Sequence, residues 1–199
     1  MRKIIVGAFV SLDGVMQAPG GPDEDPTGGF NFGGWLVPHL DEAVGATIDK
    51  MLDHSFDLLL GRKTYDIFAA HWPYAPTDPA APGYDEGNAR ITTLFDGITK
   101  YVASRSRPDL DWQNSELLGT DVVAALRELK QQDGPDLLTQ GSSDLLQTLF
   151  AADLVDELNL FTFPVVLGKG KRLFGGGASP RTFRLVESAT SSSGVVIAS

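Results

Sequence analysis

The chain has 199 residues, with 16 basic and 26 acidic side chains that give a formal net charge of −10, and it contains no cysteine. Nucleic acids and anionic membranes are bound mainly through positive charge, so this composition argues against both as partners. The absence of cysteine removes disulfides and thiolate ligands, and we predict no metal site. No apolar run approaches the roughly 20 residues that span a bilayer, and no signal peptide pattern opens the chain. We therefore expect one cytoplasmic domain over residues 1–199.

The first segments predict a central strand followed by a long loop. Residues 3–10 (KIIVGAFV) are apolar without alternation, which is typical of a strand covered on both faces. The glycine- and proline-rich residues 11–34 are too long for a simple connector, so they form a lid, a binding loop or a disordered segment. Phe30, Phe32 and Trp35 either line an apolar pocket or pin this loop to the core, and both alternatives stay open.

A helix is expected from Pro38 to Leu52, because proline suits the first turn and apolar residues follow at helical spacing. Asp41 and Glu42 fall in its first turn. Compensation of the helix dipole is sufficient to explain both residues. The functional alternative is that one of them projects into a pocket as a carboxylate.

The stretch from Leu58 to Tyr65 (LLLGRKTY) organises the prediction of function. The leucines predict a short buried strand, and Gly61 permits a sharp turn or the close approach of a ligand. Arg62 and Lys63 place two cations at that turn, and Thr64 is a candidate cap for the next helix. A strand that ends in glycine, cations and a helix N-terminus suits a phosphate. The alternative is an ordinary turn with solvated charges.

Two later junctions have the same form. The strand at 100–103 (KYVA) is followed by a hydroxyl and a cation, and the strand at 136–139 (DLLT) runs into a Gln-Gly-Ser-Ser turn before a helix that ends near Ala152. Between them, Thr120 is expected to cap a helix through Lys130. Because the carboxyl ends of strands in an α/β sheet converge on one crevice, the three junctions together predict one anion site.

The end of the chain is rich in strands. Residues 157–167 (ELNLFTFPVVL) predict a strand whose Pro164 implies an edge, a bulge or a change of direction. Residues 182–187 and 194–198 predict an antiparallel pair. We therefore expect an α/β fold with a mostly parallel central sheet and antiparallel C-terminal strands. An exposed strand at 157–167 would pair two copies into a homodimer.

In their order and spacing these segments resemble the dihydrofolate reductase-like family that includes the reductase (RibD C-terminal) domain of riboflavin biosynthesis. The resemblance implies a dihydrofolate reductase-like three-layer fold. It spans nearly the whole chain and is carried by Ser11-Leu12-Asp13-Gly14, Gly34-Trp35, Asp41-Glu42, residues 58–65, residues 100–105, Gln140-Gly141-Ser142-Ser143, residues 154–158 and residues 164–170.

The resemblance also implies NADPH as the cofactor. The family turn that contacts the cofactor phosphates is matched by Gly61, Arg62, Lys63 and Thr64. The position beside the adenosine and its 2′-phosphate is matched by Ser104 and Arg105. The turn under the pyrophosphate is matched by Gln140, Gly141, Ser142 and Ser143.

On the substrate side, dihydrofolate reductases bind the pterin through a carboxylate in the helix before the second strand. Asp41 is the closest match and the predicted catalytic residue, with Glu42 as the fallback. Asp13 matches a substrate-side residue of the riboflavin-type reductases, and Trp35 is placed on the same side. The long loop at 11–34 and the Gln-Gly-Ser turn depart from true dihydrofolate reductases, and the chain lacks the zinc deaminase domain fused to many riboflavin reductases.

The first hypothesis is therefore an NADPH-dependent reductase of a pteridine- or pyrimidine-like heterocycle, with 5-amino-6-(5-phosphoribosylamino)uracil reduction as the family's best-known reaction. That sugar phosphate needs cations at the substrate end, for which Lys169 and Lys171 are candidates. The alternative is a sensor that binds NADPH or another nucleotide without turnover. A nicotinamide pocket filled by Trp35 or Phe32 would favour the sensor, and an open pocket beside Asp41 would favour the enzyme.

Overall fold

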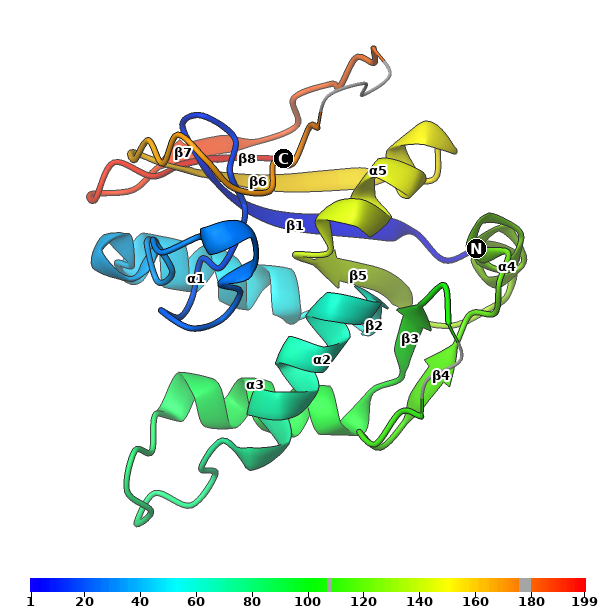
Figure 1. Cartoon of the computed structure of the whole chain (residues 1–199), viewed down its shortest axis with the longest axis horizontal. Coiled ribbons are helices and arrows are strands. Elements are labelled where there is room, and N and C mark those ends of the chain that lie inside the picture. The colour runs from blue at the N-terminus through cyan, green and yellow to red at the C-terminus, as the bar shows by residue number, and fades with distance from the viewer. Residues whose placement is uncertain (107–108, 176–179) are drawn as a thin grey trace.

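The computed structural model describes residues 1–106, 109–175 and 180–199. Within them, eight strands form one sheet in the order β4-β3-β2-β5-β1-β6-β8-β7 (Figure 1). The strands from β4 to β6 in this order are parallel, whereas β8 runs antiparallel to both of its neighbours. The predicted sheet is confirmed. Its strands are β1 (Ile4–Ser11), β2 (Phe56–Gly61), β3 (Lys100–Ala103), β4 (Ser115–Leu117), β5 (Asp136–Gln140), β6 (Glu157–Phe163), β7 (Ser188–Thr190) and β8 (Val196–Ala198).

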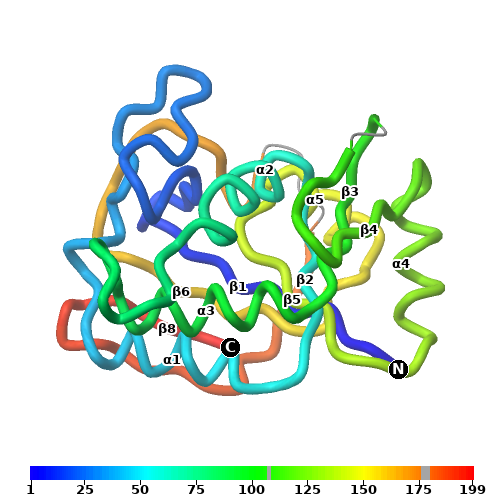
Figure 2. The backbone as a smooth tube through the Cα atoms, turned by 90° about the horizontal axis from the view of Figure 1, so that it is seen from below, coloured from blue at the N-terminus to red at the C-terminus, as the bar shows by residue number. Residues whose placement is uncertain are grey.

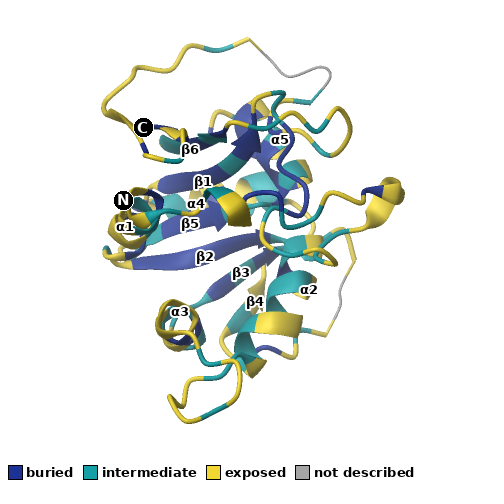
Figure 3. Ribbon diagram, turned by 90° about the vertical axis from the view of Figure 1, so that its left-hand side faces the viewer, coloured by how far each residue is buried: buried dark blue, intermediate teal, exposed yellow. Residues whose placement is uncertain are grey.

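Helices cover both faces of the sheet, because successive side chains of its central strands point to opposite sides. Leu58 and Leu60 face one apolar layer and Leu59 faces the other. The first layer packs against α1 (Glu42–Leu52), α2 (Arg62–His71) and α3 (Glu86–Gly97), and the second against α4 (Val122–Gln131) and α5 (Ser143–Ala151). Figure 3 shows the buried strands between these helices. The three-layer arrangement agrees with the prediction.

The order of the strands brings the three predicted junctions to one edge of the sheet. After β4 the chain returns through α4 and inserts β5 between β2 and β1. Gly61 and Ala103, the last residues of β2 and β3, lie opposite each other in the parallel register. Gln140 ends β5, which pairs with β2 on the side away from β3, and it lies opposite Gly7 of β1. The turns that follow these strands therefore open on a common side.

Several helix boundaries differ from the prediction. The helix expected from Pro38 is a short 3₁₀ helix (Val37–His39), and α1 begins only at Glu42. Asp41 separates the two, because its extended backbone (φ −129°, ψ 177°) and its carboxylate, which accepts from the Val44 amide at 2.9 Å, form an N-cap. Other 3₁₀ helices span Thr27–Gly29 and Trp72–Tyr74.

The two predicted threonine caps are also wrong. α2 begins directly after Gly61, one turn earlier than a cap at Thr64 would allow, and the Thr64 hydroxyl has another partner. α4 is capped by Asp121, whose carboxylate accepts from the Ala124 amide at 3.0 Å, and not by Thr120. The predicted cap lies three positions after the observed N-cap in α2 and one position before it in α4.

The C-terminal strands follow a different plan from the predicted one. β6 ends at Phe163, one residue before Pro164, and it pairs with β1 on one side and β8 on the other. The strand is therefore internal, and the prediction that residues 157–167 expose an edge for dimerisation is wrong. On this side of the sheet the edge strand is β7, which begins at Ser188, after the predicted segment 182–187.

The loop at 11–34 is fixed to the segment that follows β6, and the two run side by side (Figure 2). The Met16 amide donates to the Lys171 carbonyl at 2.8 Å, and Val15 forms an antiparallel bridge with Arg172. Phe30 and Trp35 are buried in the core, so they pin the loop. Among the described residues, no helix is both long enough and apolar enough to cross a membrane.

Candidate functional site

A cleft with a volume of about 1850 Å³ opens at the carboxyl edge of the sheet. Its walls come from the loop residues 16–25, the start of α2, the turn after β3 and the turn between β5 and α5. All of the residues predicted to bind the cofactor line this one cleft, namely Gly61, Arg62, Lys63, Thr64, Ser104, Arg105, Gln140, Gly141, Ser142 and Ser143.

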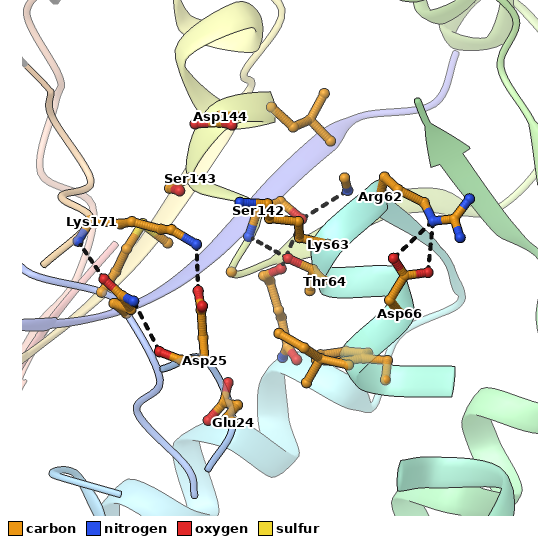
Figure 4. Close-up of a pocket in the computed structure, with 18 of the residues that line it drawn as sticks. Glu24, Asp25, Arg62, Lys63, Thr64, Asp66, Ser142, Ser143, Asp144 and Lys171 are labelled. Atoms are coloured by element: carbon orange, nitrogen blue, oxygen red, sulfur yellow. Dashed lines mark hydrogen bonds and ion pairs between the residues drawn. The ribbon is translucent and has the colours of Figure 1, made fainter. Parts of the chain in front are cut away.

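Ser142 joins two of the three junctions. Its Oγ accepts from the Gly61 amide at 2.9 Å, and its own amide donates to Thr64 Oγ1 at 2.9 Å (Figure 4). The approach is close, since a Cβ on Gly61 would lie 3.4 Å from the Ser142 side chain. Gly141 (φ 63°) and Ser142 (φ 55°) both adopt the left-handed conformation that this turn requires. The β2–α2 and β5–α5 turns are thereby held as one unit.

This unit presents two helix N-termini to the same cleft. Within the described residues, neither α2 nor α5 has a side chain that caps its first turn. The first amide groups of a helix have no partner within the helix, and the helix dipole makes this end favourable for negative charge. Two uncapped helix starts side by side suit an anion with more than one phosphate.

Cations surround this part of the cleft, which we call the phosphate end. Arg62 Nε donates to both oxygens of Asp66, at 2.7 and 2.9 Å. Its terminal nitrogens make no hydrogen bond to any described residue, and neither Lys63 nor Arg105 has an ion-pair partner within the described ranges. Asp144 also lines this end. A cluster of three cations over helix N-termini suits a ligand with several phosphates better than it suits a ligand with one carboxylate.

The opposite part, which we call the loop end, is organised around Gln17. Its Nε2 donates to the carbonyl of Asp25 at 2.9 Å, while its Oε1 accepts from the Lys171 amide at 3.0 Å. The Lys171 ammonium forms an ion pair with the Asp25 carboxylate (Figure 4). Burial acts to raise the pKa of Asp25, but the bonds from Lys171 and the Thr27 hydroxyl outweigh it and the pKa is lowered.

Glu24 is the second acidic group of the loop end. Its Oε2 accepts from the amides of Gly20 at 2.7 Å and Gly21 at 3.1 Å. Burial raises the pKa of this carboxyl, and the two amide bonds offset the rise only in part. The apolar part of the cleft lining includes Phe9, Leu36, Phe68 and Trp72.

The structure does not bring the predicted substrate-side residues to the cleft. Among the described residues that line it, Asp13, Trp35, Asp41 and Glu42 are absent. Trp35 is buried, and its Nε1 donates to the Gln17 carbonyl at 2.8 Å. Glu42 is exposed at the start of α1. These four side chains support the walls of the cleft from behind or lie on the outer surface.

The two aspartates have full sets of partners elsewhere. Asp41 accepts from the Val44 amide and, through Oδ2, from the Ser192 hydroxyl at 2.7 Å, and these bonds lower its pKa. Asp13 accepts from the Ser11 hydroxyl at 2.7 Å and from backbone amides after β6, which lower its pKa to about 2. Both carboxylates therefore hold segments of the chain together.

A family model described as the RibD C-terminal domain matches residues 2–197. The chain belongs to the RibD C-terminal domain family. The predicted resemblance is confirmed. One relative in this comparison is the uncharacterized protein YyaP of Bacillus subtilis (strain 168), which is 29% identical over 195 residues, covering 98% of this chain and 92% of the relative.

Solved structures agree on the fold of this RibD C-terminal domain. A putative riboflavin biosynthesis protein from Shewanella sp. PV-4 is 20% identical with a TM-score of 0.58, covering 98% of this chain and 96% of that one. A diaminohydroxyphosphoribosylaminopyrimidine deaminase/5-amino-6-(5-phosphoribosylamino)uracil reductase from Thermotoga maritima is 16% identical (TM-score 0.59, covering 99% and 55%). Dihydrofolate reductase from Enterococcus faecalis, complexed with NADP(H), is 13% identical (TM-score 0.55, covering 98% and 94%). The dihydrofolate reductase-like fold is thereby shown.

In this RibD C-terminal domain, sequence reasoning named Lys171 as a candidate at the substrate end but missed Gln17, Glu24 and Asp25, which surround it in the loop end. Gln17 and Lys171 are 154 positions apart, so no local pattern connects them. The one signal was the acidic run Asp23–Asp25 within a loop otherwise rich in glycine and proline. That run indicates charge but not the direction in which it faces.

Proposed function

We propose that this protein is an NADPH-dependent oxidoreductase that reduces a small heterocycle of the pteridine or pyrimidine kind. The observation that carries the proposal is the phosphate end of the cleft, where Ser142 holds two uncapped helix N-termini together beneath three cations. The amides of these two helix starts and the three cations fit a dinucleotide cofactor.

Each predicted cofactor residue has a role in this proposal. Gly141 and Ser143 would hold the pyrophosphate over the start of α5, with Arg62 and Lys63 beside it. Ser104 and Arg105 would hold the adenosine and its 2′-phosphate, for which the planar guanidinium is well suited. The bound cofactor supplies the hydride. The chain's own residues bind it, orient it towards the loop end and exclude water there.

The names of two structurally similar proteins support the reaction class. The Thermotoga maritima protein is named as a 5-amino-6-(5-phosphoribosylamino)uracil reductase, and the Enterococcus faecalis enzyme is named as a dihydrofolate reductase with NADP(H). Reduction of the phosphorylated pyrimidine is therefore one candidate reaction for this chain. We also propose that the protein is cytoplasmic and forms a homodimer.

The alternative of a sensor without turnover is less well supported. Trp35 is buried in the core and Phe32 is 43% exposed, and neither lines the cleft within the described residues. The cleft is thus not filled by the aromatic side chains that a sensor would use to block it, which supports the enzyme. Asp41, the other residue expected to mark the enzyme, is absent from the described lining, so it gives the enzyme no support.

Titration of the purified protein with NADPH and NADH tests the proposal. We expect micromolar NADPH binding, about −8 kcal/mol, and weaker NADH binding. Arg105→Ala should lower NADPH affinity about tenfold or more, because a charged hydrogen bond is worth about 1.5–3 kcal/mol, and should change NADH affinity less. Lys63→Ala should weaken both cofactors. Arg127→Ala, on the exposed side of α4 and outside the cleft, is the control.

NADPH oxidation is then followed with a panel of pteridines and pyrimidines. A protein that bound neither cofactor would contradict the proposal at its first step. Binding without turnover of any substrate would favour the sensor.

A further inference from the structure

The loop end of the cleft offers no unengaged lysine or arginine to a phosphate, within the described part of the chain. Lys171 is the lysine that lines it, and its ammonium is held by Asp25. Lys169 lies outside the cleft, where its Nζ donates to a loop carbonyl at 2.9 Å. Arg172 binds the backbone carbonyl and the carboxylate of Asp13. The basic segment that could have received a sugar phosphate is therefore used to fasten the loop.

The charges that remain at the loop end are mostly negative. Asp23, Glu24 and Asp25 line it, against Lys171 and the exposed ring of His71. A phosphate dianion placed here would face carboxylates a few ångströms away, in a partly buried site where such repulsion is weakly screened. Groups that donate hydrogen bonds or carry positive charge would instead be attracted by these carboxylates.

Glu24 is prepared to accept from such a group. Its Oε2 is fixed by the two amides of Gly20 and Gly21, so the side chain has a defined position. Its Oε1 makes no hydrogen bond to any described residue and stays open to a ligand. A carboxylate can accept several hydrogen bonds, and those to an amino or amidine group are among the strong ones.

The apolar lining of the cleft favours a flat ring. Phe9, Phe68 and Trp72 supply aromatic surface to the cleft, and Leu36 adds an aliphatic wall. Sites for small molecules combine apolar walls with a few placed polar groups that fix the orientation of the ligand. The placed group here is the free oxygen of Glu24.

We propose that the loop end selects a planar heterocycle that bears amino or ring N–H donors and no phosphate, and that Glu24 accepts those donors. The inference rests on the proposed function, since the phosphate end is then taken by NADPH. It makes the phosphorylated pyrimidine a poor substrate and its unphosphorylated counterpart, or a pteridine, a good one.

Calorimetric titration with and without saturating NADPH tests this. The probes are a diaminopyrimidine and a ribosylaminopyrimidine with and without its 5′-phosphate. We expect the unphosphorylated compound to bind at least about tenfold more tightly than its phosphate. Glu24→Gln should lower diaminopyrimidine affinity at least about tenfold, by loss of a charged hydrogen bond, with NADPH affinity unchanged. Glu128→Gln, an exposed change on α4, should alter neither.

If the phosphorylated compound bound the wild-type protein more tightly than the unphosphorylated one at saturating NADPH, the inference would be overturned, and no variant would be needed. Equal diaminopyrimidine affinity of Glu24→Gln and the wild type would overturn the role of Glu24. A protein that bound diaminopyrimidine but not NADPH would instead overturn the proposed function and support the loop-end selectivity, so the two failures are distinguishable.

Discussion

Ser142 is the residue on which the phosphate end depends most directly. It is buried, it adopts a left-handed backbone, and its hydroxyl satisfies the Gly61 amide. The left-handed conformation costs an ordinary residue about 1–2 kcal/mol. The strained backbone keeps Ser142 in the position from which its hydroxyl makes the hydrogen bond between the two turns.

Ser142→Ala should therefore destabilise the protein by about 1–3 kcal/mol, because the partly buried Gly61 amide loses its acceptor while the backbone strain stays. Ser142→Gly loses the same bond but relieves the strain, so it should be about 1 kcal/mol more stable than the alanine variant. Both should weaken NADPH binding by loosening the joined turns. Urea unfolding measures the stabilities.

Ser143→Ala is the matched control for stability only, since Ser143 is itself proposed to bind the cofactor. Its hydroxyl makes no hydrogen bond to the described residues, and such changes are within about 0.5 kcal/mol. An alanine variant at 142 as stable as the wild type would show that the tie between the turns contributes nothing.

At the scale of elements, Asp41 connects α1 to the β7–β8 hairpin. One carboxylate oxygen caps α1 through the Val44 amide, and the other accepts from the Ser192 hydroxyl and from the Ser193 amide at 2.8 Å. These bonds stabilise the charged form and lower the pKa of Asp41 below its ordinary value of 3.8. A group of this kind stabilises the fold above its unfolded pKa, and that stabilisation is lost as the pH falls through the lower folded value.

Asp41→Asn should accordingly lower the stability at pH 7, since an amide nitrogen would face two donors, while NADPH binding and turnover are kept. The wild type's advantage should shrink as the pH falls below about 4, where the carboxylate begins to protonate in the unfolded chain. Urea unfolding at neutral and acid pH, with steady-state NADPH oxidation at neutral pH, measures both. If turnover were lost while stability was unchanged, Asp41 would have a catalytic role.

The elements that were predicted well are those whose signal is local. β3 was predicted at its observed bounds, and β5 within one residue, because short apolar runs flanked by turn residues define them. The convergence of the three junctions on one cleft was predicted for the same reason, since each junction is read from a few consecutive residues. The bond between Asp41 and Ser193 could not be predicted, because the two residues lie 152 positions apart.

At the scale of the whole molecule, the strand order could be predicted only by class. The parallel and antiparallel parts follow from the alternation of strands and helices. The place of β6 inside the sheet does not, because it depends on β8 returning to pair with Leu160–Thr162. The loop end depends in the same way on the basic segment 169–172 returning to the 11–34 loop.

The exposed surface around β7 bears on assembly. Residues 182–190 are all exposed, yet they include Phe183, Leu185 and Val186, the last of which is 72% exposed. One edge of β7 pairs with β8, and its other edge has no strand partner among the described residues. An edge strand beside exposed apolar side chains is a surface that a second copy can cover.

We therefore expect a homodimer formed through β7 and residues 182–187. Each chain carries a formal charge of −10, so repulsion opposes association, and added salt should strengthen the dimer by screening it. Val186→Glu should weaken the dimer about tenfold or more, because it buries a charge in an apolar contact. Val166→Glu is the matched control, since Val166 is 70% exposed and lies outside this surface. Sedimentation velocity over a range of concentrations gives the dissociation constants. Equal weakening by the two variants, or a wild type that stays monomeric at high salt, would place the interface elsewhere or remove it.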